Sequence, residues 1–257
     1  MRVRELAPDQ ILFNGKIVTL DASSNVSTAV AIKDGRIVAV GSDTDLLLTA
    51  GTNTEQFDFK GKMVIPGIFD SHNHLMQVGV KLTRIRLDEC RSPQEMMELV
   101  RRRAAVTPPG EWIIGEGWNE NIFEDGRLPT RHDIDPATDR HPVILMRFFN
   151  MDVVNSVALA LAGVDETTPD PEGGKIEHDA DGSPNGILRA AAKLYVRDLM
   201  PQMSQAELVE AIRLGCEDMH RYGITSVIDP GLMPFEVQAY QAAYASGWLS
   251  VRVNMML

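Results

Sequence analysis

The sequence predicts a mixed α/β fold in which a small all-β module precedes alternating strands and helices. Three observations lead to this expectation. Two short segments near the start carry turn dipeptides between apolar runs, and an apolar segment at 64–70 ends in a pair of histidines. From residue 204 to residue 257, helical and strand patterns alternate. Alternation of this kind is typical of parallel α/β structure.

The β module is expected from the segments 11–20 and 29–41. Asn14-Gly15 and Asp34-Gly35 each interrupt a run of β-branched and apolar residues. Such dipeptides adopt the positive φ of tight two-residue turns. The sequence therefore predicts two hairpins within residues 1–63.

The expected strand at 64–70 is notable for the residues that follow it, His72 and His74. Side chains of an extended segment alternate between faces, so these two can reach one metal ion together. Two histidines in a surface loop are the other interpretation, but here they end an apolar run that we expect to be buried, which favours a metal site. Asp70 faces the same side and either orients a ligand or is purely structural.

Segment 86–203 interrupts the alternation of strands and helices. Patterns within it predict a helix at 92–100, strands at 111–120 and 142–147, and a helix after residue 155. Trp118 and Asn119 end a glycine-flanked strand. They either belong to the core or line a pocket that the glycines allow the backbone to approach.

Composition and charge exclude several functional classes. The 257 residues are 44% hydrophobic and 24% charged, with a net charge of −11. This charge argues against a nucleic-acid partner, and no apolar segment is long enough to span a membrane. Residues 1–5 lack the apolar core of a secretory signal. Cys90 and Cys216 are too few for a disulfide framework, so we expect a cytoplasmic protein with reduced thiols.

The histidine strand resembles the first barrel strand of the metal-dependent amidohydrolase superfamily, Pro-Gly-Phe-Ile-Asp-x-His-x-His, with Ile68 and Phe69 in exchanged order. Further motifs resemble the amidohydrolase-3 or YtcJ-like group, which includes N-substituted formamide deformylase. They lie at 112–118, 128–130, 142–145, 154–159, 168–176 and 182–188. One departure is Asn150, where many members have a histidine.

This resemblance implies an incomplete TIM-like (β/α)8 barrel with an N-terminal β-sandwich half at 1–63. The first barrel strand would lie at 64–85, an inserted α+β subdomain at 86–203, and about two further barrel strands at 204–257. A complete barrel takes about 250 residues. We therefore expect the N-terminal portion of a longer enzyme, with the remaining metal ligands and the catalytic aspartate beyond Leu257.

The function implied by the resemblance is hydrolysis of carbon–nitrogen bonds other than peptide bonds. His72 and His74 would hold a divalent ion, expected to be zinc, which activates water for attack on a small amide-type substrate. Asp70, Trp118, Asn119 and Asp229 would support the ligands or contact substrate.

Two alternatives stay open at this point. Asp229 precedes Pro230 and could instead cap a turn. The chain could also be a catalytically incompetent fragment, or a non-enzymatic remnant that binds partners through an open barrel edge. Neither nucleic acid nor membrane is expected as a partner, and a homo-oligomer is one option for assembly.

Overall fold

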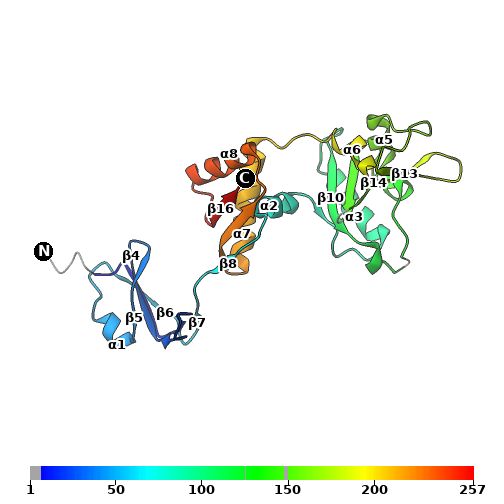
Figure 1. The fold of residues 1–257 in the computed structure, drawn as a ribbon. Coiled ribbons are helices and arrows are strands. Elements are labelled where there is room, and N and C mark those ends of the chain that lie inside the picture. Colours follow the sequence, from blue (N-terminus) through cyan, green and yellow to red (C-terminus); the bar gives the residue numbers. More distant parts are fainter. Residues whose placement is uncertain (1–6, 125, 148–149) are drawn as a thin grey trace. The chain divides into compact units, whose positions relative to one another are not determined.

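The computed structural model describes residues 7–124, 126–147 and 150–257, and the chain divides into two compact units, residues 1–69 and 70–257 (Figure 1). Residues 1–5, examined above for a secretory signal, lie outside the described residues. Across the described ranges, no helix has the length and apolar character needed to cross a membrane.

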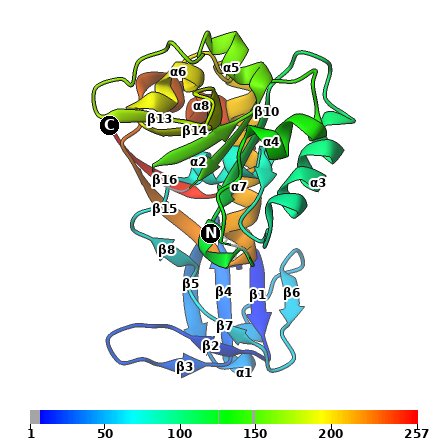
Figure 2. The ribbon, with the colours of Figure 1, turned by 90° about the vertical axis from the view of Figure 1, so that its right-hand side faces the viewer.

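The described part of the N-terminal unit contains two small sheets with strand orders β5-β4-β1-β6 and β3-β2-β7 (Figure 2). Ile11, Ala29, Ala31 and Leu46 form its buried core. Its elements are β1 (Gln10–Phe13), β2 (Lys16–Val18), β3 (Val26–Ser27), β4 (Ala29–Lys33), β5 (Arg36–Gly41), α1 (Asp43–Leu47), β6 (Glu55–Asp58) and β7 (Met63–Val64).

Of the two expected hairpins, the second is confirmed and the first is wrong. β4 and β5 pair antiparallel around Asp34 and Gly35, whose φ values are +49° and +70°. β1 instead pairs with β4 and β6, whereas β2 pairs with β3 and β7. Asn14, with φ of +53°, turns the chain from one sheet into the other, and its amide donates to the Asp58 carboxylate at 2.7 Å. The dipeptide thus predicts a turn but not which strands pair.

The strand before the histidines is shorter and more exposed than expected. Val64 lies opposite Ile17 in the N-terminal sheet, so only β8 (Ile68–Asp70) leads directly to the histidines. Ile68 and Phe69 are 45% and 56% exposed. The expectation of one buried strand from residue 64 is therefore wrong, because the apolar run is divided between two sheets and β8 is the edge strand of its sheet.

Strands alternate with helices at both ends of the segment 68–257. β15 (Ile224–Pro230) lies between β8 and β16 (Arg252–Met256), and β15 pairs in parallel with β16. The helices are α2 (Leu75–Thr83), α7 (Gln205–Arg221) and α8 (Pro234–Ala245). The helices and strands expected between residues 204 and 257 are confirmed. The structure adds a capping box at the start of α7, in which Ser204 and Glu207 satisfy each other's backbone N–H groups.

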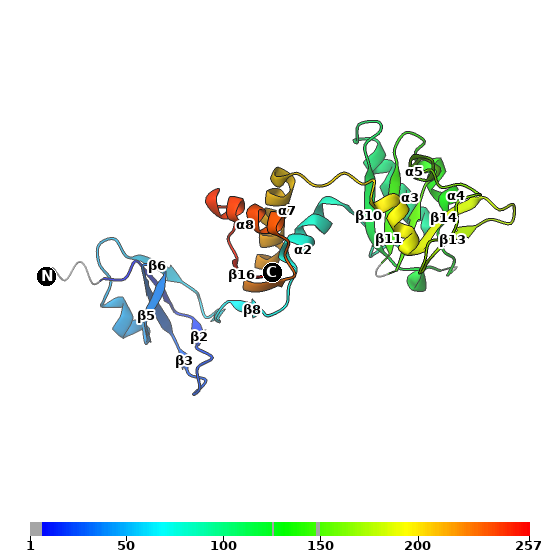
Figure 3. The same ribbon diagram turned by 45° about the horizontal axis from the view of Figure 1, so that its top comes forward.

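Helices α2 and α7 lie side by side and touch through their backbones (Figures 1 and 3). A β-carbon on Gly79 would lie 1.7 Å from the carbonyl oxygen of Ala211, and one on Gly215 would lie 2.5 Å from that of Leu75. Only residues without a side chain permit this approach. Because α2 begins directly after His74 and α7 leads into β15, the contact determines where the ends of β8 and β15 lie.

Residues between α2 and α7 form a lobe around a six-stranded sheet of order β13-β14-β12-β11-β10-β9 (Figure 3). β9, β10 and β11 are parallel, and the other pairings are antiparallel. Its strands are β9 (Ile85–Arg86), β10 (Ile113–Trp118), β11 (Val143–Arg147), β12 (Met151–Val154), β13 (Gly174–His178) and β14 (Pro184–Ala190). Its helices are α3 (Pro93–Ala104), α4 (Arg131–Ile134), α5 (Ser156–Ala162) and α6 (Leu194–Arg197), with 3-10 turns η2 (Glu120–Ile122), η3 (Asp135–Ala137) and η4 (Ala191–Lys193).

The close helix contact predicts that Gly79→Ala destabilises the second unit by about 3 kcal/mol, at the upper end for overpacked cores, because the backbones must separate. Gly41→Ala is the matched control, since a β-carbon there meets only Leu46 at 3.8 Å. Urea unfolding of the two variants measures the difference. Equal stability of both variants would contradict the claim that α2 and α7 leave no room for a β-carbon at Gly79.

Candidate metal centre

His72 and His74 lie between β8 and α2, at the end of the strand. Their ring centroids are 5.3 Å apart and the ring planes are perpendicular. His72 is exposed, and the side chain of His74 is 50% exposed. Imidazole nitrogens are common ligands of zinc and related divalent ions. The two rings are thus accessible, close together and chemically suited to one ion.

The turn that carries the histidines is held by Asp70 and Asn73. The Asp70 carboxylate accepts hydrogen bonds from the His72 backbone N–H at 3.1 Å and from the Asn73 side-chain amide at 2.9 Å. The hydrogen bond from the Asn73 amide has the largest effect in lowering the pKa of Asp70, and the one from the His72 N–H lowers it further. The backbone N–H of Asn73 donates to the carbonyl of Ile228 on β15 at 2.8 Å. Asp70 therefore shapes the turn that presents both imidazoles.

Asp229, near the end of β15, is the buried acid beside this turn. Its side chain is 1% exposed, and its Oδ1 lies 3.5 Å from His74 Nδ1. Its Oδ2 accepts a hydrogen bond from the hydroxyl of Tyr240 on α8. That hydroxyl accepts a hydrogen bond from the Met76 backbone N–H at 3.1 Å. Burial raises the pKa of Tyr240, and the hydrogen bond to the Asp229 carboxylate raises it further. The phenol therefore keeps its proton and donates a hydrogen bond to Asp229.

Asp229 Oδ1 has no hydrogen-bond partner, although it is buried. A buried carboxylate oxygen without a donor is costly, and it marks a place where a proton donor or a cation fits. The two neighbouring imidazoles suit a divalent ion, and the unsatisfied oxygen lies next to one of them, 3.5 Å from His74 Nδ1. Within the described ranges, no group of three or more histidine, cysteine, aspartate or glutamate side chains is placed to hold a metal.

An open depression of about 480 Å³ adjoins His74 and Asp229. The residues around it come from the start of α2, the end of β15 and the start of α8. They are His74, Met76, Gln77, Asp229, Pro230, Gly231, Leu232, Met233 and Glu236.

Trp118 and Asn119 lie in the lobe between α2 and α7, at the end of β10. Trp118 is fully buried, donates from its indole N–H to the Leu145 carbonyl at 2.9 Å and stacks on Phe123 at a centroid distance of 6.3 Å. Asn119 caps η2 and accepts a hydrogen bond from the Asn121 backbone. The side chain of Trp118 thus serves the core, and a substrate contact by either residue stays a prediction.

Tyr240 is a residue of this site that was not among the candidates expected from the sequence. The buried positions of α8 are Glu236, Ala239, Tyr240 and Ala243. This helical spacing would have placed Tyr240 on the inward face, where a buried hydroxyl needs a partner. Its partner, Asp229, could not be read from spacing because the two residues lie on different elements.

Comparison with known proteins agrees with this geometry. The family model described as amidohydrolase family, Amidohydro_3, matches residues 55–256. The chain belongs to this amidohydrolase family. A putative amidohydrolase from Bacillus subtilis, YtcJ, is 33% identical over 254 residues, which is 96% of this chain and 48% of the relative. The N-substituted formamide deformylase of Arthrobacter pascens is 31% identical over 249 residues, 93% of this chain and 45% of the relative.

Two solved structures of metal-dependent hydrolases resemble the fold of this chain. A metal-dependent hydrolase from Pyrococcus furiosus superposes with a TM-score of 0.72 at 27% identity, covering 96% of this chain and 49% of that one. A metal-dependent hydrolase from Pyrococcus horikoshii superposes with a TM-score of 0.70 at 24% identity, covering 96% of this chain and 48% of that one, and this likeness supports the fold alone. The mixed α/β fold of a metal-dependent hydrolase is therefore shown. The chain spans about half the length of the relatives it matches.

The contrast between exposed histidines and a buried tryptophan predicts effects of very different size on stability. Trp118→Ala should lower the free energy of unfolding by about 3–5 kcal/mol, because it removes a fully buried indole. His72→Ala should change it by less than about 0.5 kcal/mol, because the ring is exposed. Chemical denaturation of the metal-free variants measures both. A large loss in His72→Ala would mean that the ring is structural.

Proposed function

We propose that the chain contributes His72 and His74 to the metal site of a hydrolase that cleaves carbon–nitrogen bonds other than peptide bonds. The observation that carries this proposal is the pair of accessible imidazoles at one strand end, beside a buried and unsatisfied carboxylate oxygen. Zinc is the proposed ion because imidazole nitrogen is among its preferred ligands. One relative is named N-substituted formamide deformylase, and a formamide contains a bond of the proposed class.

We also propose that β8, β15 and β16 are strands of a TIM-like (β/α)8 barrel. Support comes from the parallel pairing of β15 with β16 and from α8, which connects these two strands. Active sites of such barrels lie at the carboxyl ends of the strands, where His72, His74 and Asp229 are found. In this proposal the segments 1–63 and 86–203 are a β-sandwich half and an inserted subdomain.

The residues of this chain would have distinct roles in the reaction. His72 and His74 hold the ion, and Asp70 with Asn73 fixes the turn that presents them. A bound divalent ion supplies a water activated near neutral pH and polarises the substrate carbonyl. Because catalytic zinc sites use about three protein ligands, the two imidazoles form part of the set. The exposed histidine rings leave room for a small amide-type substrate to reach them.

A non-enzymatic role is the second candidate. It is favoured by one observation, that the described residues bring no third metal ligand next to the two histidines. Metal analysis separates the two candidates, because a partner-binding remnant has no need of a tightly held ion. For either candidate we propose a cytoplasmic location, which the free and buried cysteines Cys90 and Cys216 support.

The proposal predicts that the full chain binds a divalent ion through the two histidines. His72→Ala and His74→Ala should each weaken zinc binding by more than about 100-fold, beyond the effect typical of an outer partner. His132→Ala is the matched control, because this histidine pairs with Asp179 in the inserted lobe. Titration of zinc against a chelator measures the affinities.

Hydrolysis of N-substituted formamides by the zinc-loaded chain, lost in both histidine variants, would support the enzymatic candidate. Zinc binding that both variants retain at full strength would contradict the assignment of the ligands.

A further inference from the structure

The buried carboxylate of Asp229 has one oxygen satisfied and one oxygen unsatisfied. Oδ2 accepts a hydrogen bond from the hydroxyl of Tyr240. Oδ1 has no hydrogen-bond partner and lies 3.5 Å from His74 Nδ1. Formed N–H···O hydrogen bonds measure about 2.7–3.2 Å, so a small rotation of the His74 ring would complete one.

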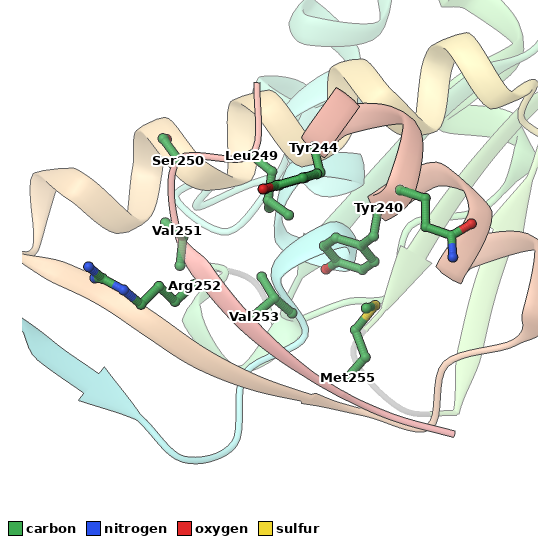
Figure 4. A pocket seen from close by; sticks show the side chains of 9 residues that line it. Tyr240, Tyr244, Leu249, Ser250, Val251, Arg252, Val253 and Met255 are labelled. Carbon is green, nitrogen blue, oxygen red and sulfur yellow. The ribbon is translucent and has the colours of Figure 1, made fainter. Parts of the chain in front are cut away.

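Tyr240 fixes the orientation of this carboxylate. Its ring lies on the wall of an apolar depression between α8 and β16, with Val253 and Met255 nearby (Figure 4). Its hydroxyl donates to Asp229 and accepts from the Met76 backbone N–H, so three elements meet at one oxygen. With Oδ2 held from this side, Oδ1 remains directed at His74.

We propose that Asp229, held by Tyr240, is a positioning residue that keeps the proton of His74 on Nδ1 and so leaves Nε2 free to bind the metal ion. This proposal rests on the proposed function of His74 as a ligand. A metal-bound histidine usually donates its other ring N–H to a carboxylate or carbonyl, which fixes both the tautomer and the ring orientation. Asp229 Oδ1 is the acceptor that the structure offers His74.

The turn-capping role considered for Asp229 fits the structure less well. A capping carboxylate accepts hydrogen bonds from backbone N–H groups of its own turn. Here Oδ2 accepts a hydrogen bond from the Tyr240 side chain on α8, and Oδ1 has no hydrogen-bond partner. The carboxylate is therefore directed away from its own turn.

The proton position can be measured in the unmodified chain. In the metal-free protein at about pH 8.5, where an ordinary histidine is neutral, long-range proton–nitrogen NMR distinguishes the two tautomers. The signals of His74 are assigned by their loss in His74→Gln. The proposal expects the proton of His74 on Nδ1. A proton on Nε2 would overturn it, and this test needs no variant of Asp229 to fold.

Asp229→Asn provides the second test. The amide can still accept from Tyr240, but its NH2 group then faces His74 Nδ1, so the proton of His74 should move to Nε2. Zinc affinity should fall about 10–100-fold, as for other outer partners. His72 in the same sample is an internal control and should keep its tautomer. An unchanged His74 tautomer, or the same change in both histidines, would overturn the proposal.

Tyr240→Phe tests the support of the carboxylate, with Tyr244→Phe as the matched control on the same helix, because Tyr244 is 76% exposed. Tyr240→Phe should weaken zinc binding measurably and leave His74 in a mixture of tautomers, whereas Tyr244→Phe should change neither. Equal behaviour of both variants would overturn the role of Tyr240. If His72→Ala also retained full zinc affinity, the proposed function would fail, while the tautomer of His74 would still decide the contact with Asp229.

Discussion

The backbone contact between α2 and α7 is the constraint on which the candidate site depends. Gly79 meets the carbonyl of Ala211 and Gly215 meets that of Leu75, at distances that no side chain tolerates. α2 starts one residue after His74, and α7 leads through a short turn into β15. Fixing the two helices against each other therefore fixes the histidine turn against the strand that carries Asp229. The hydrogen bond from the Asn73 N–H to the Ile228 carbonyl joins the same two segments.

The carboxylate of Asp229 is where this arrangement becomes chemically informative. A buried acid is stable when its oxygens are satisfied, and Tyr240 satisfies one of them. The other is left for His74, whose ring is half exposed and can turn. The site thus combines one rigid, buried group with two accessible imidazoles. This combination of a buried acid with accessible imidazoles is useful in a metal site, because the acid can orient a ligand without binding the ion itself.

Local sequence signals predicted the elements well and their partners less well. Asp34-Gly35 marked a hairpin, because a tight turn depends on neighbouring residues alone. Asn14-Gly15 marked a turn, but the strands on either side belong to different sheets, which depends on contacts distant in sequence. The residue types of the histidine motif predicted the candidate ligands. Tyr240, Gly79 and Gly215 were missed because their partners lie on other elements, and spacing along one element cannot identify them.

The central proposal is a metal site to which this chain contributes two imidazoles. The chain belongs to an amidohydrolase family, and the relatives compared with it are about twice its length. Anomalous X-ray diffraction at the zinc absorption edge, on crystals of the zinc-loaded chain, tests this proposal most directly. The proposed site predicts a single strong anomalous peak from one zinc ion, which binds one ring nitrogen of His72 and Nε2 of His74, with His74 Nδ1 facing Asp229. A zinc ion bound elsewhere, with both histidines free of it, would contradict the account.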